Sequence, residues 1–137
     1  MRKFVKLLSL ILALSMCVCV FTACGSKVDL DAPEEVVDPE EEAVTKVVND
    51  FFEAMTSLNL DEALSYCGSE EMLYSVEIEL SRTPDVWQDM KCNIQSITVD
   101  EDEAIVKVEV YYGNKSDKGK LRLSKYNDTW KIYDMSI

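Results

Sequence analysis

Apolar residues recur at every third or fourth position after residue 43, which is the spacing of a helix with one buried face. This stripe comprises Val44, Val47, Val48, Phe51, Met55 and Leu58. Asp38 can cap such a helix, Pro39 suits its first position, and Glu41 stands three residues after the cap. The pattern therefore predicts a long helix that begins at Pro39 and buries this stripe.

Two shorter helices are predicted next. Asn59 suits the cap of the first, which Gly68 would end, and Ser69 suits the cap of the second, which runs to about Leu80. Pro84 then stops the helical pattern, because proline disfavours a helical residue before it. Apolar residues also alternate in the second half of this segment, so a strand there is the alternative to a helix.

From residue 87 onward the apolar period changes to two, as in strands with one buried face. The alternation over residues 90–94 and that over residues 97–99 differ in phase by one residue. A β-bulge at residues 95–96 would keep both sets on the same face. The remaining pattern predicts a strand over residues 104–112, a loop over 113–119, a strand containing Leu121 and Leu123, a tight turn at 127–128 and a last strand over 129–137.

Helices followed by about four antiparallel strands indicate an α+β domain whose sheet lays its apolar face on the long helix. A bulge bends a strand, and a bent sheet around a helix makes a cone. Side chains can fill such a cone or leave it open as a pocket. The sequence leaves both alternatives standing.

The first 26 residues follow a different pattern. Residues 1–6 read MRKFVK and are positively charged, and the apolar run that follows ends in VFTAC at Cys24. This order of a charged start, an apolar core and small residues at a boundary is that of a secretory signal. Residues 7–26 contain no charge, a stretch of 20, so an uncleaved membrane-spanning anchor is the rival interpretation.

The VFTAC segment resembles the lipobox of bacterial lipoproteins, although Phe21 stands where leucine is commoner. The resemblance implies that the Cys24 sulfur receives a diacylglycerol and that residues 1–23 are removed as a lipoprotein signal peptide. It also implies that Cys24 is the first residue of the mature protein, held in the bilayer by its acyl chains.

Residues 24–42 contain eight acidic residues and two prolines and show no apolar period. Like charges repel one another, so we expect this lipidated segment to be an extended, flexible tether. The folded domain would then span residues 43–137.

Charge and composition exclude several function classes. Residues 24–137 carry 26 acidic and 11 basic residues, a formal net charge of −15. A surface of that charge should repel nucleic acid and anionic headgroups. The chain has no histidine, which excludes histidine-based catalytic triads and histidine-rich zinc sites. No metal site and no cofactor is expected.

Two segments carry a second resemblance. Residues 47–67 read VVNDFFEAMTSLNLDEALSYC, and residues 127–137 read NDTWKIYDMSI. Together with the order of elements, they resemble the nuclear-transport-factor-2-like, or cystatin-like, superfamily, in particular small bacterial lipoproteins with lumazine-binding-like or uncharacterised domains. The resemblance implies a curved sheet wrapped around a long helix, often with a pocket. That superfamily includes isomerases and dehydratases as well as binding and dimerising domains, so the fold does not fix the function.

Few residues stand out as candidates for a site. Carboxylates occur on pocket-forming elements (Asp50, Glu53, Asp89 and Asp134), but none belongs to a catalytic motif, and no catalytic residue is assigned. Trp87 and Tyr112 are the candidates for the rim of a pocket. Cys67 and Cys92 could form a disulfide in an oxidising compartment, or could remain two buried thiols.

These observations predict a lipid-anchored binding or interaction domain on the extracytoplasmic face of a bacterial cell membrane. Its partners would be the bilayer, through Cys24, and a small apolar ligand or an envelope protein. One alternative is a structural module that forms a homodimer through its sheet. The other is a lyase or isomerase built in the cone, although an enzyme is the less favoured interpretation.

Overall fold

The computed structural model describes residues 37–137 of the 137-residue chain. The predicted signal peptide, Cys24 and most of the predicted tether lie outside the described residues. Within residues 37–137, none of the helices combines the length and apolarity that crossing a bilayer requires.

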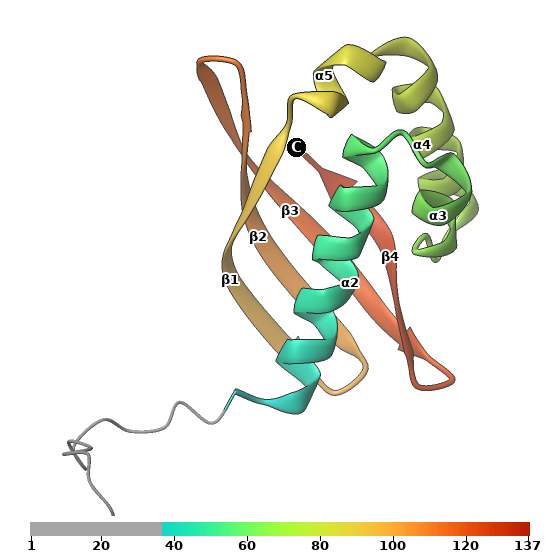
Figure 1. The fold of residues 1–137 in the computed structure, drawn as a ribbon. Coiled ribbons are helices and arrows are strands. Elements are labelled where there is room, and N and C mark those ends of the chain that lie inside the picture. Colours follow the sequence, from blue (N-terminus) through green and yellow to red (C-terminus); the bar gives the residue numbers. More distant parts are fainter. Residues whose placement is uncertain (1–36) are drawn as a thin grey trace, which may run out of the picture. The chain divides into compact units, whose positions relative to one another are not determined.

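This part of the chain folds as four helices followed by a four-stranded antiparallel sheet, which confirms the α+β prediction (Figure 1). The helices are α2 (Pro39–Thr56), α3 (Leu60–Ser65), α4 (Glu70–Arg82) and α5 (Pro84–Gln88). The strands are β1 (Lys91–Asp100), β2 (Glu103–Tyr112), β3 (Lys115–Tyr126) and β4 (Thr129–Ser136). They lie in the order β1-β2-β3-β4, so each strand pairs with its neighbour in the sequence.

Helix α2 begins where the sequence predicts. The Asp38 carboxylate accepts a hydrogen bond from the Glu40 amide at 2.9 Å, and Pro39 occupies the first turn, where its missing amide hydrogen costs no hydrogen bond. Residues 39–42, which the expected domain boundary at residue 43 assigned to the tether, therefore belong to this helix.

The next two segments are also helical. The Ser69 hydroxyl accepts from the Met72 amide at 3.1 Å and caps α4, so the helix is correct for this segment and the alternative strand is wrong. Gly68, however, does not end α3, which stops at Ser65. Its amide donates to the Ile132 carbonyl at 2.6 Å, and a Cβ on Gly68 would stand 2.8 Å from the Lys131 Cβ. Glycine is required here because the chain passes directly against β4.

The sheet follows the predicted phase, with one difference in length. The register between β1 and β2 shifts between Ile94 and Ser96, which confirms the bulge. The seven-residue loop predicted over residues 113–119 is wrong, because Tyr112 pairs with Lys115 across a two-residue turn. The first residues of β3 pair with β2 alone and are exposed, so this segment forms a strand without the apolar residues that a buried strand needs.

One core joins α2 to the concave face of the sheet. Its helical half includes Val44, Val48, Phe51 and Met55, and its sheet half includes Val106, Val108, Val110, Leu121, Leu123 and Ile132, all of them fully or almost fully buried. Trp130 also lies in this core and is 3 % exposed. The part of the cone between α2 and the sheet is thus filled with side chains.

Candidate functional site

Helix α5, the β2–β3 turn and the end of β4 lie at the same end of the domain (Figure 1). Two adjoining hollows lie among their side chains. The inner hollow has a volume of about 480 Å³ and lies among α4, α5 and the ends of the strands. The outer hollow, of about 550 Å³, lies between α5 and the β2–β3 turn. Val86 and Tyr112 line both, so a bound molecule could extend from one hollow into the other.

Apolar side chains from several elements line the inner hollow: Val86, Trp87, Met90, Met135 and Ile137. Trp87 is only 4 % exposed, and its ring lies on Phe52 of α2 with the ring centroids 6.4 Å apart. Pro84 begins α5 in the first helical position, and this short helix places Trp87 inward. The hollow therefore has a rigid aromatic floor that belongs to the domain core.

Polar groups lie around this apolar floor. The Tyr112 hydroxyl donates a hydrogen bond to the Asp117 carboxylate on the neighbouring strand. This hydrogen bond raises the pKa of Tyr112 above its usual value of 10. On the opposite wall the Thr83 hydroxyl donates to the Glu79 carboxylate at 3.2 Å. Asp117 and Glu79 leave free acceptor positions that a donor group on a ligand could use.

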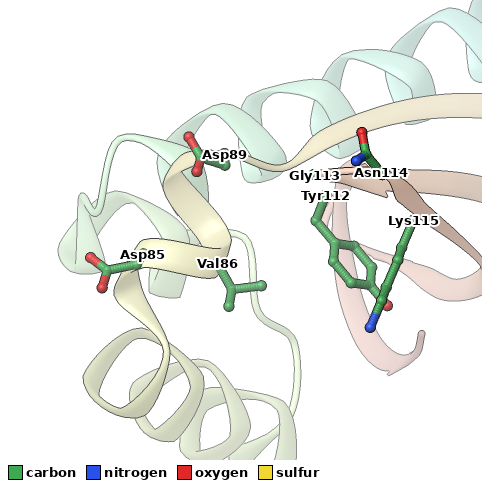
Figure 2. A pocket seen from close by; sticks show the side chains of 7 residues that line it. All are labelled: Asp85, Val86, Asp89, Tyr112, Gly113, Asn114 and Lys115. Carbon is green, nitrogen blue, oxygen red and sulfur yellow. The ribbon is translucent and has the colours of Figure 1, made fainter.

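The outer hollow is open and shallow by comparison. Figure 2 shows Val86 pointing from α5 toward Tyr112 and Lys115 of the β2–β3 turn, whereas Asp85 points away. The narrow turn depends on Gly113, whose φ of +58° is a conformation that residues with a Cβ rarely adopt. This turn fixes the position of Tyr112 at the boundary between the two hollows.

Trp87 and Tyr112, the two residues predicted for a pocket rim, both line the inner hollow. The structure corrects the role of Trp87, which is a buried floor residue rather than an exposed rim residue, because the unpredicted helix α5 turns it toward Phe52. No pattern in the sequence singles out Val86, Glu79 or Asp117 for this site. Their common neighbourhood depends on α5 and on the length of β3, which the period of apolar residues does not reveal.

The disulfide considered between Cys67 and Cys92 is not formed, and both side chains are free thiols. Cys67 bridges to β4, whereas Cys92 lies on β1 at the opposite edge of the sheet. The register also places Cys92 level with Asp117 but Cys67 level with Leu123, an offset of about 20 Å along β3. A disulfide requires Cα atoms within about 7 Å. Burial raises the pKa of each thiol to about 11.

The candidate carboxylates of the isomerase alternative do not converge. Asp50 forms an ion pair with Lys46 on α2, and Asp134 lies 3.7 Å from Arg122 on the face of the sheet opposite the core. Asp89 lines the outer hollow, and Asp50 lines a separate, open hollow along α2, so the two carboxylates face different sites. No polar or charged residue among residues 37–137 is buried.

The described residues offer an arrangement for binding. Their hollows combine an aromatic and thioether floor with a few hydrogen-bonding groups, which is the usual composition of a small-molecule site. Across residues 37–137, no three Cys, Asp or Glu side chains lie close enough together to hold a metal ion.

Comparison with known proteins identifies the fold. No protein-family model matches the chain, and no curated protein sequence matches it either. Solved structures do match. An NTF2-like protein of unknown function from Methylobacillus flagellatus KT superimposes with a TM-score of 0.59 at 18% identity, covering 74% of this chain and 92% of that one.

Two further structures agree. An NTF-2-like protein of unknown function from Shewanella oneidensis MR-1 gives a TM-score of 0.56 at 15% identity and covers 70% of this chain and 96% of that one. A de novo designed protein with a curved β-sheet gives a TM-score of 0.51 at 19% identity and covers 67% of this chain and 95% of that one. The described domain therefore has the nuclear-transport-factor-2-like fold that its sequence resembles.

Proposed function

We propose that this protein is a lipid-anchored, extracytoplasmic binding domain that takes a small, largely apolar ligand into the inner hollow. The observation that supports this most is the combination of Trp87, Met90 and Met135 on the walls of one hollow, with Tyr112 and Asp117 beside them. Aromatic and thioether side chains adapt to an apolar molecule, while the two polar groups can orient it.

The proposed anchor rests on the sequence. The charged start, the apolar core and the VFTAC segment support removal of residues 1–23 and acylation of Cys24, as in the bacterial lipoproteins that this segment resembles. Two acyl chains give stable membrane attachment where one gives only marginal attachment. The acidic residues after Cys24 would then link the bilayer to the domain on the outer face of the cytoplasmic membrane, in the manner of small lipoproteins with lumazine-binding-like or uncharacterised domains.

The hollow limits the ligand by size. A volume of about 480 Å³ lies within the range of about 300–1,000 Å³ that is usual for small-molecule sites. An apolar group can pack against Val86 and Met135 while a donor group reaches Asp117. The adjoining outer hollow leaves room for a longer molecule.

A structural dimer is the second candidate, favoured by the filled core between α2 and the sheet. Such a dimer predicts a molecular mass in solution that rises with concentration. A monomer with a ligand in the inner hollow predicts a constant protein mass.

Native mass spectrometry of the protein purified from its own cells tests the binding site. We expect an added small-molecule mass in the natural protein and its loss in Val86→Trp, whose larger ring fills the space that both hollows share. Tyr74→Trp on the exposed face of α4 is the control and should retain the added mass. An added mass that both variants keep would contradict binding in the hollow.

Intact mass of the protein extracted from membranes tests the anchor separately. We expect a chain that begins at Cys24 and carries a diacylglycerol. We also expect Cys24→Ala to stay unprocessed at this position. A chain that still contains residues 1–23, or a Cys24→Ala protein that is cut at the same position, would contradict the anchor.

A further inference from the structure

The charges of this acidic protein are divided between its two layers. Residues 39–89, which form the four helices, contain 13 acidic and only 2 basic residues. Residues 91–137, which form the sheet, contain 8 of each sign. The net negative charge of the described domain therefore lies on the helices, and the sheet is neutral overall.

Positive charge concentrates at the centre of the sheet face opposite the core. Four side chains form this basic sheet patch: Lys107, Lys118, Lys120 and Arg122. Each alternates along its strand with residues of the inner face, such as Val106, Val108 and Leu121, so each points away from α2.

The basic sheet patch is only partly neutralised within the domain: Glu109 stands opposite Lys118 in the register, and Asp134 lies 3.7 Å from Arg122. Lys107 and Lys120 stand directly opposite each other in the register of β2 and β3, and like charges in that position repel. Their row continues to Ser96 on β1 and Ser136 on β4, neither of which is charged. Among residues 37–137, Lys107, Lys118 and Lys120 form no ion pair, and only Arg122 has one.

Apolar and aromatic side chains accompany these charges on the same face. Ile105 pairs with Arg122 across β2 and β3 and is 41 % exposed. Tyr111 is 37 % exposed and follows Glu109 on the same face of β2. Lysine and arginine beside exposed tyrosine and aliphatic side chains suit the boundary between water and a phospholipid bilayer.

We propose that the basic sheet patch docks on anionic phospholipid headgroups of the bilayer that carries the protein. This inference rests on the proposed anchor, because acylation of Cys24 would hold the domain close to that surface at a high local concentration. Lysine and arginine side chains near an anionic leaflet are attracted to it individually. A weak attraction between the patch and the headgroups is enough for docking, because the acyl anchor already keeps the domain at the membrane.

The overall negative charge does not prevent this docking. The acidic side chains of the helices lie across the core from the outer face of the sheet, and even two stacked sheets lie about 10 Å apart. The Debye length is about 8 Å at physiological ionic strength, so these acids are largely screened at the bilayer surface. The net charge of residues 24–137 predicts that the protein repels anionic headgroups. That prediction sums the charges of all faces, so it does not describe the outer face of the sheet.

Two other occupants fit the patch less well. A second copy that packs sheet against sheet would place Lys107 and Lys120 near the same residues of its partner, which adds repulsion. The chain's own acidic residues before residue 37 have suitable charge, but the linkage of Cys24 to the bilayer would draw them toward the membrane. Docking by the sheet leaves α4 and α5, and with them the two hollows, facing away from the bilayer.

Lysine acetylation of the full-length membrane-extracted protein tests the proposal. The protein is reconstituted into vesicles of phosphatidylcholine alone or with about 30 mol % phosphatidylglycerol. We expect Lys107 to react at least about fivefold more slowly in the anionic vesicles, and this protection to disappear in about 0.5 M NaCl. Lys46 on α2 is the internal reference and should react equally in both vesicles.

Charge-reversing variants sharpen the test. Lys118→Glu/Lys120→Glu should abolish the protection of Lys107, whereas Lys46→Glu should leave it unchanged. Circular dichroism checks that each variant is folded, and the comparison of the two vesicles for the natural protein needs no variant. Equal reaction of Lys107 in both vesicles would overturn the proposal.

Two results would assign the patch to another occupant and also overturn the proposal. Protection in both vesicles that grows with protein density would indicate a second copy. Protection in detergent micelles without phospholipid would indicate the chain's own acidic segment. Intact mass of the same sample reports acylation at Cys24, so a failed anchor is recognised independently of failed docking.

Discussion

The Glu40 carboxylate accepts a hydrogen bond from the Trp130 indole at 3.0 Å, although the two residues are 90 positions apart. Its other oxygen accepts from Lys125 at 2.6 Å, and the Lys125 ammonium lies 5.8 Å from the centre of the Trp130 ring. The first turn of α2 is thereby joined to the β3–β4 turn. This contact fixes the end of the helix that is opposite the hollows.

Glu40→Ala should lower the melting temperature at pH 7, because it leaves the Trp130 indole and Lys125 without their shared acceptor. The hydrogen bonds from Lys125 and Trp130 hold the pKa of Glu40 below its usual value of 4.5. Their contribution is therefore complete above pH 4.5 and is lost as the pH falls through the lower pKa of the folded state. Thermal melts across pH 2–7 should show that the melting temperatures of Glu40→Ala and the natural protein become more similar at the lowest pH values.

The neighbouring exposed residue Glu42 provides the control, since it lies in the same turn of α2. Glu42→Ala should melt close to the natural protein at every pH. Equal melting temperatures for the Glu40 and Glu42 variants at pH 7 would show that the hydrogen bonds of Glu40 with Lys125 and Trp130 do not stabilise the folded domain.

Gly68→Ala should destabilise the domain by about 1–3 kcal/mol, the usual cost of overpacking. Its Cβ would stand 2.8 Å from the Lys131 Cβ, so the chain must move away from β4. That movement strains two hydrogen bonds, from the Gly68 amide to Ile132 and from the Ile132 amide to Tyr66. Urea denaturation measures the change.

Gly113→Ala is the control for Gly68→Ala, because it also replaces glycine by alanine but creates no steric clash. Nothing lies within 4 Å of its added Cβ, but its φ of +58° disfavours alanine by about 1–2 kcal/mol. Hydrogen exchange separates the two effects. Faster exchange of the Ile132 amide is expected in Gly68→Ala alone, and unchanged exchange there would refute the close approach to β4.

The two thiols of the folded domain should react slowly with iodoacetamide at pH 8. Burial raises the pKa of Cys67 and Cys92 to about 11, so little reactive thiolate is present. Unfolding in urea exposes both and should restore rapid alkylation. Peptide mass mapping should show Cys67 and Cys92 both alkylated without prior reduction, and a protein in which neither is alkylated until a reductant is added would contain a disulfide after all.

The period of apolar residues predicts most of the fold because the core is built from one face of each element. It locates the stripe of α2, the alternation of β2 and the bulge before Ser96, each of which the structure confirms. Caps at Asp38 and Ser69 locate the helix starts, since their side chains act on adjacent backbone groups. These signals are local and can be read from neighbouring residues.

The site depends on relationships that are not local. Helix α5 is five residues long, too short to show a period, yet it turns Trp87 into the core. The polar start of β3 resembles a loop in composition, but pairing with β2 extends it and brings Asp117 beside Tyr112. The distance between Cys67 and Cys92 likewise follows from the strand order rather than from their spacing in the sequence.

Methyl-region NMR of the protein, titrated with a panel of small aromatic and aliphatic compounds, tests the proposed binding hollow most directly. The methyl groups of Val86, Met90 and Met135 report from its walls, and those of Val44 and Val48 report from the far end of the core. We expect saturable shifts confined to the first three. Shifts spread evenly over the molecule, or none from any compound, would contradict a ligand site at the open end of this domain.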